Sequence, residues 1–128
     1  MRILQAKFLS LALLLSLPTL AATKAHSSLR ITKWTFCWSL SSAKTSSRAG
    51  DNVYYSTAFE NDFTEVGDGL LVNKWIAFVK ENLPEDESLG TSSCYRGLYG
   101  TREEVVSTRS SNIAGDRRTK KVHLLDWP

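Results

Sequence analysis

The side chains best suited to proton transfer in this chain are its two histidines, His26 and His123. Histidine titrates near neutral pH, so it is the usual general acid or base of an enzyme. A mechanism with two histidines would need both rings at one site, yet His26 lies in a polar N-terminal stretch that no predicted element holds. His123 lies among apolar residues near the C-terminus, with Asp126 close behind it. His123 and a carboxylate such as Asp126 are therefore the candidates for a small secreted hydrolase or nuclease.

The two cysteines, Cys37 and Cys94, have three alternative chemistries: a thiol nucleophile, part of a metal site, or a disulfide. A nucleophilic Cys94 would use His123 as its base. Two cysteines without nearby histidine partners make a poor zinc site, so we expect no metal. An even pair in an exported protein most simply forms one bridge. We therefore predict a Cys37–Cys94 disulfide, worth about 4 kcal/mol on the chain-entropy relation.

Other catalytic and ligand-binding patterns are missing from the sequence. The serines include no G-x-S-x-G elbow, which a nucleophilic serine of the hydrolase type needs. The acidic residues Glu60, Asp62, Glu65 and Asp68 lack the alternating ligands and sixth-position glycine of an EF-hand. A solvated acidic loop, with Asp68 capping the next helix, is the expectation for this stretch. We expect no cofactor, and a binding protein rather than an enzyme.

Aromatic and arginine side chains are the more informative group. They crowd two predicted strands and the segment after Cys94. Tyrosine, tryptophan and arginine are favoured at protein interfaces, and a set of them left exposed would form a binding patch. Packing in the core is the alternative role for the same side chains. The candidate binding residues are Trp34, Trp38, Tyr95, Arg96, Tyr99 and Arg102.

The N-terminus has the order of an export signal. Arg2 and Lys7 precede a short apolar run, which Pro18 ends before a stretch of small residues. The run is shorter than the roughly 20 residues that a membrane span requires. Residues 1–22 are therefore predicted to be a signal peptide, and residues 23–128 a single domain with no membrane span. We expect the mature protein in the periplasm or outside the cell.

The charge distribution argues against a nucleic-acid partner. Removing Arg2 and Lys7 lowers the formal net charge from +3 to +1. Residues 23–50 hold five bases and no acid, residues 51–87 hold nine acids and two bases, and residues 96–128 hold seven bases and four acids. A nucleic-acid-binding domain would show a concentrated basic stripe instead.

The predicted elements form a small α+β domain. Apolar alternation and β-branched residues predict antiparallel strands at residues 29–38, 53–59 and 120–127. An amphipathic helix at residues 70–82 should cover this three-stranded sheet. Thr101 and Glu104 form a capping box for a second helix, which has few apolar residues and should pack peripherally. Residues 39–52, 60–69 and 85–93 are predicted to be loops.

A set of single residues is scattered along the chain in a fixed order: Cys37, Tyr54-Tyr55-Ser56 with Phe59, Trp75 with Phe78, Cys94, Arg109 and Asp126-Trp127. In this order the chain resembles a loose set of small exported bacterial proteins whose activity is uncharacterised. The resemblance covers residues 37–127 and implies a disulfide-linked α+β domain, with no catalytic residue to carry over.

The sequence thus predicts an exported, non-enzymatic binding module whose partner is another protein or an envelope component. Two alternatives stay open: the hydrolase or nuclease that uses His123, and a secreted inhibitor of another enzyme. The sequence leaves the oligomeric state undetermined.

Overall fold

The computed structural model describes residues 31–128 apart from residue 49 and residues 64–67. The predicted signal of residues 1–22, the segment with His26, and Glu65 lie outside the described residues. The described residues form two helices and five strands, which confirms the α+β class. None of these helices is long and apolar enough to cross a membrane.

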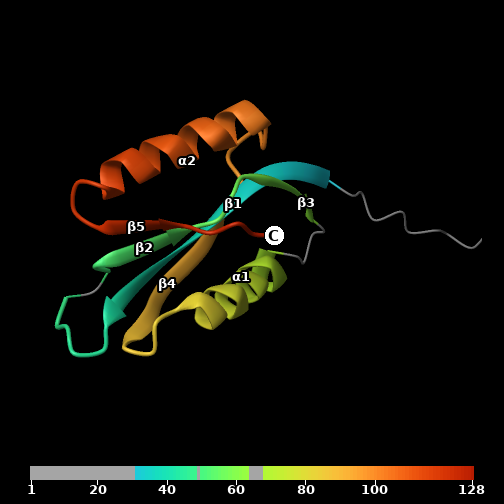
Figure 1. The fold of residues 1–128 in the computed structure, drawn as a ribbon. Coiled ribbons are helices and arrows are strands. Elements are labelled where there is room, and N and C mark those ends of the chain that lie inside the picture. The colour runs from blue at the N-terminus through green and yellow to red at the C-terminus, as the bar shows by residue number, and fades with distance from the viewer. Residues whose placement is uncertain (1–30, 49, 64–67) are drawn as a thin grey trace, which may run out of the picture.

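The first strand is the centre of the sheet because it pairs along both of its edges. β1 (Ile31–Ala43) pairs antiparallel with β2 (Asn52–Tyr55) and β3 (Phe59–Phe63) along successive segments. β4 (Glu87–Tyr95) pairs antiparallel with β1 opposite β2. β5 (Lys121–Leu124) pairs in parallel with β2. The sheet is therefore mixed, with β4 and β5 as outer strands (Figure 1).

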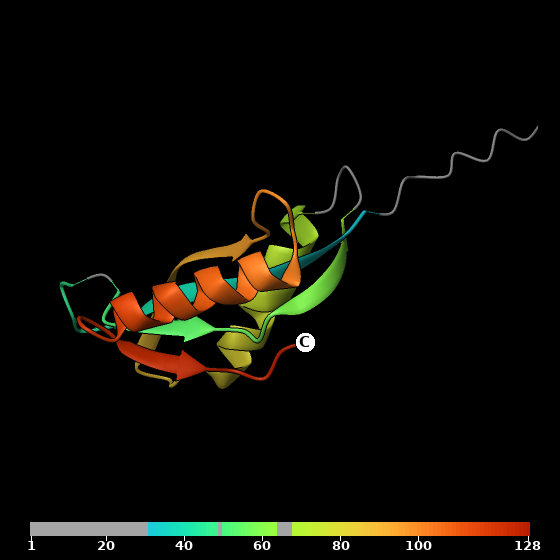
Figure 2. The ribbon, with the colours of Figure 1, turned by 90° about the horizontal axis from the view of Figure 1, so that it is seen from above.

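The two helices lie on opposite faces of this sheet. α1 (Asp68–Asn82) covers one face and α2 (Arg102–Asp116) the other, so the fold has three layers (Figure 1). Seen from above, α2 lies over the strands, with α1 on their far side (Figure 2). Successive strand residues point to opposite faces, so each strand can supply both layers with side chains.

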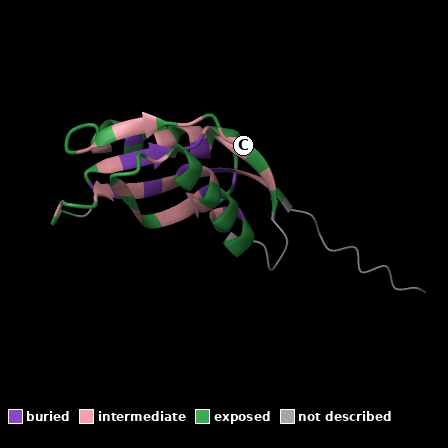
Figure 3. Cartoon of the chain, turned by 60° about the horizontal axis from the view of Figure 1, so that its bottom comes forward, coloured by how far each residue is buried: buried purple, intermediate pink, exposed green. Residues whose placement is uncertain are grey.

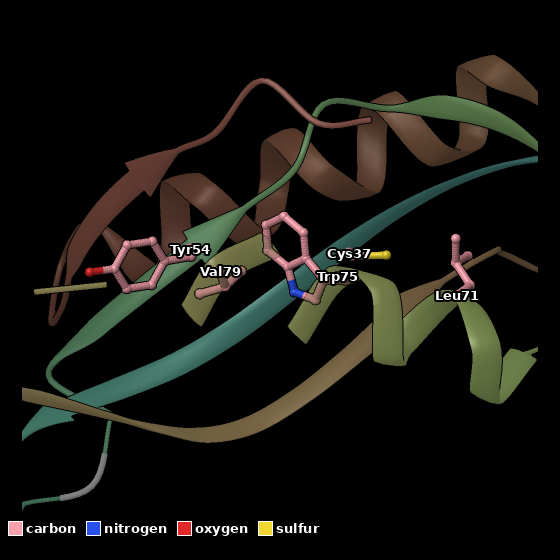
Figure 4. Close-up of a cluster of buried hydrophobic side chains, with 5 residues drawn as sticks. All are labelled: Cys37, Tyr54, Leu71, Trp75 and Val79. Atoms are coloured by element: carbon pink, nitrogen blue, oxygen red, sulfur yellow. The ribbon is translucent and has the colours of Figure 1, made fainter. Parts of the chain in front are cut away.

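The core under α1 is built around Trp75, which is fully buried. Its indole Nε1–H donates to Ser39 Oγ at 2.7 Å, so the ring has no unpaired polar atom. Trp127 packs against Trp75 with ring centroids 5.3 Å apart, which fixes the C-terminal segment to this core. The buried residues of this cluster, drawn in Figure 4, are Cys37, Tyr54, Leu71, Trp75 and Val79.

A second core lies under α2, and it corrects the prediction that this helix is peripheral. Val105 and Ile113 of α2 are buried, and the sheet supplies the larger side chains that they cover. The thin apolar side of α2 was misleading because aromatic residues of β1 and β2 fill most of this layer. The buried members are Phe36, Val53, Tyr55, Val105 and Ile113, and Figure 3 shows the buried segments concentrated on the central strands.

Three predicted loops and the strand count are also corrected. β1 runs to Ala43, five residues past Trp38, and β3 and β4 occupy parts of the predicted loops at 60–69 and 85–93. β4 is rich in serine and lacks alternating apolar residues, so its pairing with β1 decides its conformation rather than its own propensity. The last strand was expected to pair antiparallel, but β5 runs parallel to β2. The antiparallel pairing of β1 with β2 and the helix at 70–82 are confirmed.

The predicted disulfide is confirmed. Cys37 and Cys94 lie directly opposite each other in the β1–β4 register, and their sulfur atoms are bonded. The bridge links the centre of the sheet to its outer strand.

Candidate functional site

The most exposed apolar side chains of the described residues lie on the loop between β4 and α2, which we call the 96–100 loop. Leu98 is 77% exposed and Tyr99 is 76% exposed. Burial of two large apolar side chains against a partner would be favourable, and exposed apolar side chains that lie together mark interaction sites. Their adjacency at one turn makes this loop the candidate functional site.

The backbone of the 96–100 loop is held by one carboxylate from α2. Glu104 Oε1 accepts a hydrogen bond from the Leu98 N–H at 2.7 Å. Its Oε2 accepts from the N–H groups of Tyr99 and Gly100, both at 3.0 Å. Consecutive backbone N–H groups that converge on one anion form a nest, and here the anion comes from the chain itself.

The titration of Glu104 reflects this arrangement. Desolvation raises the pKa of the carboxyl, but the backbone hydrogen bonds from residues 98–101 outweigh it and lower the pKa below 4.5. Thr101 Oγ1 accepts from the Glu104 N–H at 3.3 Å, which confirms the N-cap half of the predicted capping box. The Glu104 carboxylate does more than a capping box requires, because it also bonds to the three amides that precede Thr101.

Glycine is required at both ends of the loop tip. Gly97 has φ +66°, and a Cβ there would lie 2.6 Å from the Glu104 carboxylate. Gly100 has φ +64°, and a Cβ there would lie 2.7 Å from the Lys33 side chain. Both values of φ strain any residue with a Cβ. The two glycines thus let the backbone close around Glu104.

The two ends of the 96–100 loop are fixed to β1. The Thr35 hydroxyl donates to the Tyr95 carbonyl at 2.7 Å, and the Trp34 N–H donates to the Gly100 carbonyl at 2.9 Å. The Arg102 guanidinium lies 5.5 Å from the centre of the Trp34 ring, a cation–π contact. The loop therefore presents its tip from a rigid base.

The structure divides the six predicted binding residues. Tyr95 is half-buried and packs on Phe36 with ring centroids 5.3 Å apart, so it belongs to the core. The side chains of Arg96, Tyr99 and Arg102 are exposed around the loop, with Trp34 half-buried beneath Arg102. Trp38 lines a separate pocket near the other end of α2.

Sequence reasoning missed Leu98 and the role of Glu104. The spacing Gly97-Leu98-Tyr99-Gly100 was the available signal, since two glycines around two large residues are typical of a tight, exposed turn.

His123 lies on β5, on the face of the sheet that α1 covers, opposite Tyr54 of β2. Its ring stacks on Tyr54 with centroids 4.6 Å apart, and Nε2 lies 3.2 Å from Asn52 Oδ1. Among the described residues no hydrogen bond or ion pair joins His123 to Asp126. The described residues also include no cluster of metal-binding side chains. Asp126 is therefore not bonded to His123, and the hydrolase or nuclease alternative stays a prediction.

Tyr54, beside His123, belongs to a polar network at the end of this face. Its hydroxyl donates to Glu87 Oε2 at 2.8 Å, and the Ser41 hydroxyl donates to the same oxygen at 2.7 Å. Burial, then the hydrogen bond and charge of Glu87, raise the pKa of Tyr54 from 10.0 to about 12. Burial and Asp116, whose Oδ2 accepts from the Tyr55 hydroxyl at 2.6 Å, raise the pKa of Tyr55 as well.

These two tyrosines predict a loss of stability in alkali. Below pH 10 both are neutral in the folded and unfolded chain, and their contribution is fully present. Between pH 10 and about 12 the unfolded chain loses protons that the folded Tyr54 keeps. The free energy of unfolding should therefore fall by up to about 1.4 kcal/mol per pH unit for each tyrosine. Urea denaturation across this range measures the slope, and Tyr54→Phe with Tyr55→Phe should flatten it; an unchanged slope contradicts the prediction.

Comparison of the chain with protein-family models, with curated proteins and with solved structures finds no match. The resemblance to small exported bacterial proteins therefore stays a prediction.

Proposed function

We propose that this protein is an exported, non-enzymatic module that binds another protein through the 96–100 loop. The observation that carries the proposal is the exposure of Leu98 and Tyr99 on a backbone that Glu104 already holds. A loop fixed before binding loses little conformational entropy when it binds. Tyrosine is among the usual anchors of such contacts, and Leu98 adds apolar area to bury beside it.

The surroundings of the loop indicate what the partner offers. Leu98 and Tyr99 need an apolar recess about as wide as two side chains. The exposed guanidinium of Arg102 lies over Trp34 at the base of the loop, and an acidic group on the rim of the recess would complement this cation. The partner is therefore a protein with an apolar pocket and an acidic edge.

The disulfide supports the exported location. Disulfides form and persist in the periplasm and outside the cell, and are rare in the cytosol. With the signal-like sequence of residues 1–22, the Cys37–Cys94 bridge supports a working site in one of these compartments.

A second candidate, a secreted enzyme inhibitor, uses the same loop. A fixed loop with two large exposed side chains suits insertion into an enzyme cleft, because many tight inhibitors bind with little change of shape. The two candidates differ only in whether the captured partner is an enzyme whose activity falls on binding.

The test compares the exposed apolar pair of the loop with one exposed apolar residue elsewhere on the surface. Protein cross-linked in the exported fraction should capture one partner, and Leu98→Ser with Tyr99→Ser should reduce capture at least about tenfold, as loss of two anchors does. Leu124→Ser is the matched control, because Leu124 is 52% exposed but lies on β5, away from the loop. Equal capture by the loop variant and the control overturns the proposal. An activity assay on the captured partner then separates the inhibitor from other binders.

A further inference from the structure

A pocket lies on the α2 face of the sheet, beside the C-terminal half of α2. It has a volume of about 460 Å³ and is open to solvent, which is within the range of roughly 300–1,000 Å³ of small-molecule sites. The 96–100 loop precedes the N-terminus of α2, a helix of 15 residues, so the two features lie about 20 Å apart along its axis. The pocket is thus a separate site.

Trp38 provides an aromatic wall for this pocket and remains partly exposed. Its neighbour in the β1–β4 register is Ser93, and residues directly opposite in a pair share a face. Serine is too small to cover an indole. On the helix side the lining includes Gly115, which has no side chain. The ring is therefore left partly accessible beside Ser93 and Gly115, while Tyr55, its neighbour on β2, forms the adjoining part of the pocket.

The charges in the pocket are already paired. Asp116 and Lys120 are its only charged lining residues among those described, and Lys120 Nζ lies 2.9 Å from Asp116 Oδ1. Their side chains are 24% and 27% exposed, so both can still reach a ligand. The Tyr55 hydroxyl donates to the other carboxylate oxygen of Asp116 at 2.6 Å, which fixes its orientation. A site with balanced charge has no preference for a cation or an anion.

The polar groups around Trp38 both donate and accept hydrogen bonds. Asp116 accepts, Lys120 donates, and the Asn112 amide and Ser111 hydroxyl do both. A sugar ring has the complementary chemistry: its C–H groups form an apolar face, and its rim carries hydroxyls that donate and accept. An aromatic side chain offers the flat apolar surface that such a face needs.

We infer that this pocket binds a neutral saccharide, with the sugar ring stacked on Trp38 and its hydroxyls bonded to Asp116, Asn112 and Lys120. The inference does not depend on the 96–100 loop having a protein partner. A saccharide site fits an exported protein, because polysaccharides are present in cell envelopes. Affinity at one open pocket of this kind should be millimolar.

The test is an NMR titration of the purified protein, labelled with nitrogen-15. The probes are three neutral disaccharides, cellobiose, maltose and N,N′-diacetylchitobiose, with choline as a cation and inorganic phosphate as an anion for comparison. At least one disaccharide should give saturable shifts at the Trp38 indole N–H and the Asn112 side-chain amide, and choline and phosphate should give weaker ones or none. Absence of a saturable shift with all three disaccharides overturns the inference, and so does tighter binding of choline or phosphate.

Two variants locate the binding. Trp38→Ala should weaken saccharide binding by about tenfold or more, as removal of an aromatic anchor does. Asn112→Ala changes an exposed residue, so the fold is kept, and should weaken binding about threefold, the loss expected for one exposed hydrogen bond. Ser110→Ala is the matched control, since Ser110 is exposed on α2 and does not line the pocket. Unchanged affinity in Asn112→Ala, or shifts that map away from Trp38, place the saccharide elsewhere and overturn the inference.

Discussion

Replacing both half-cystines, as Cys37→Ala together with Cys94→Ala, should lower the free energy of unfolding by about 4 kcal/mol. The bridge joins residues 57 apart in sequence, so it removes the entropy of a long loop from the unfolded chain. The folded chain depends on it too, because β4 is an outer strand in which every residue is partly or fully exposed. Thermal unfolding measures the effect, and the midpoint should fall by roughly 15–30 °C.

The control for this variant is Ser93→Ala, next to Cys94 on β4, which keeps the bridge and should change the midpoint little. Reduction of the unchanged protein should reproduce the loss seen in the double variant, because both break the same covalent link. A fall of less than about 1 kcal/mol would show that pairing with β1 holds β4 without the bridge, and that the unfolded chain is already compact.

The predictable part of the fold is the part with a strong local pattern. The helix at 70–82 has a broad apolar side and becomes α1, and Thr101 with Glu104 marks the start of α2. β4 and β3 were missed because partners far away in sequence determine them. β4 gains its hydrogen bonds from β1, and β3 pairs Asp62 and Asn61 with Thr32 and Lys33 despite its acidic composition. Local propensity cannot show such pairing.

The parallel pairing of β5 and the burial of α2 were missed for a related reason. α2 covers the second apolar face of the sheet, and by crossing this face from β4 to β5 it lets β5 run in the same direction as β2. The sequence shows that Trp34, Phe36 and Trp38 alternate with Cys37. Cys37 points to the face that α1 covers, and the three aromatic residues point to the face that α2 covers. The excess of aromatic residues on this strand was therefore a signal of a second helix layer.

The sequence predicted several residues of the candidate site, but it did not predict how the loop is held or which side chains it exposes. Tyr99, Arg96 and Arg102 were singled out for their residue types, and they do lie around one loop. Tyr95 was included because tyrosine is favoured at interfaces, yet its ring packs against the core under α2. Which side chain a loop exposes depends on the turn geometry, which the positive φ of Gly97 and Gly100 sets here.

Glu104→Ala should release the 96–100 loop without unfolding the domain. Three backbone N–H groups would lose their shared charged acceptor, and hydrogen bonds to charged groups are stronger than neutral ones. The amide hydrogens of Leu98, Tyr99 and Gly100 should then exchange with water at least about tenfold faster, and capture of the partner should fall together with them. Glu103→Gln is the matched control, because Glu103 is the exposed neighbour in the same helix turn.

Acid should release the 96–100 loop as Glu104→Ala does, because protonation removes the charge of the Glu104 carboxylate. The pKa of Glu104 in the folded chain is lower than its ordinary value of 4.5. The hydrogen bonds from the loop to the carboxylate are therefore fully present above pH 4.5. They are lost as the pH falls through the lower pKa of the folded chain. Protection of the three amides should therefore persist at pH 4.5 and disappear only below it. In Glu104→Gln the side-chain amide carries no titrating group, so this acid transition should be absent. An acid transition that persists in Glu104→Gln would assign the pH dependence to another carboxyl, and unchanged exchange in Glu104→Ala would show that the glycine turns alone shape the loop.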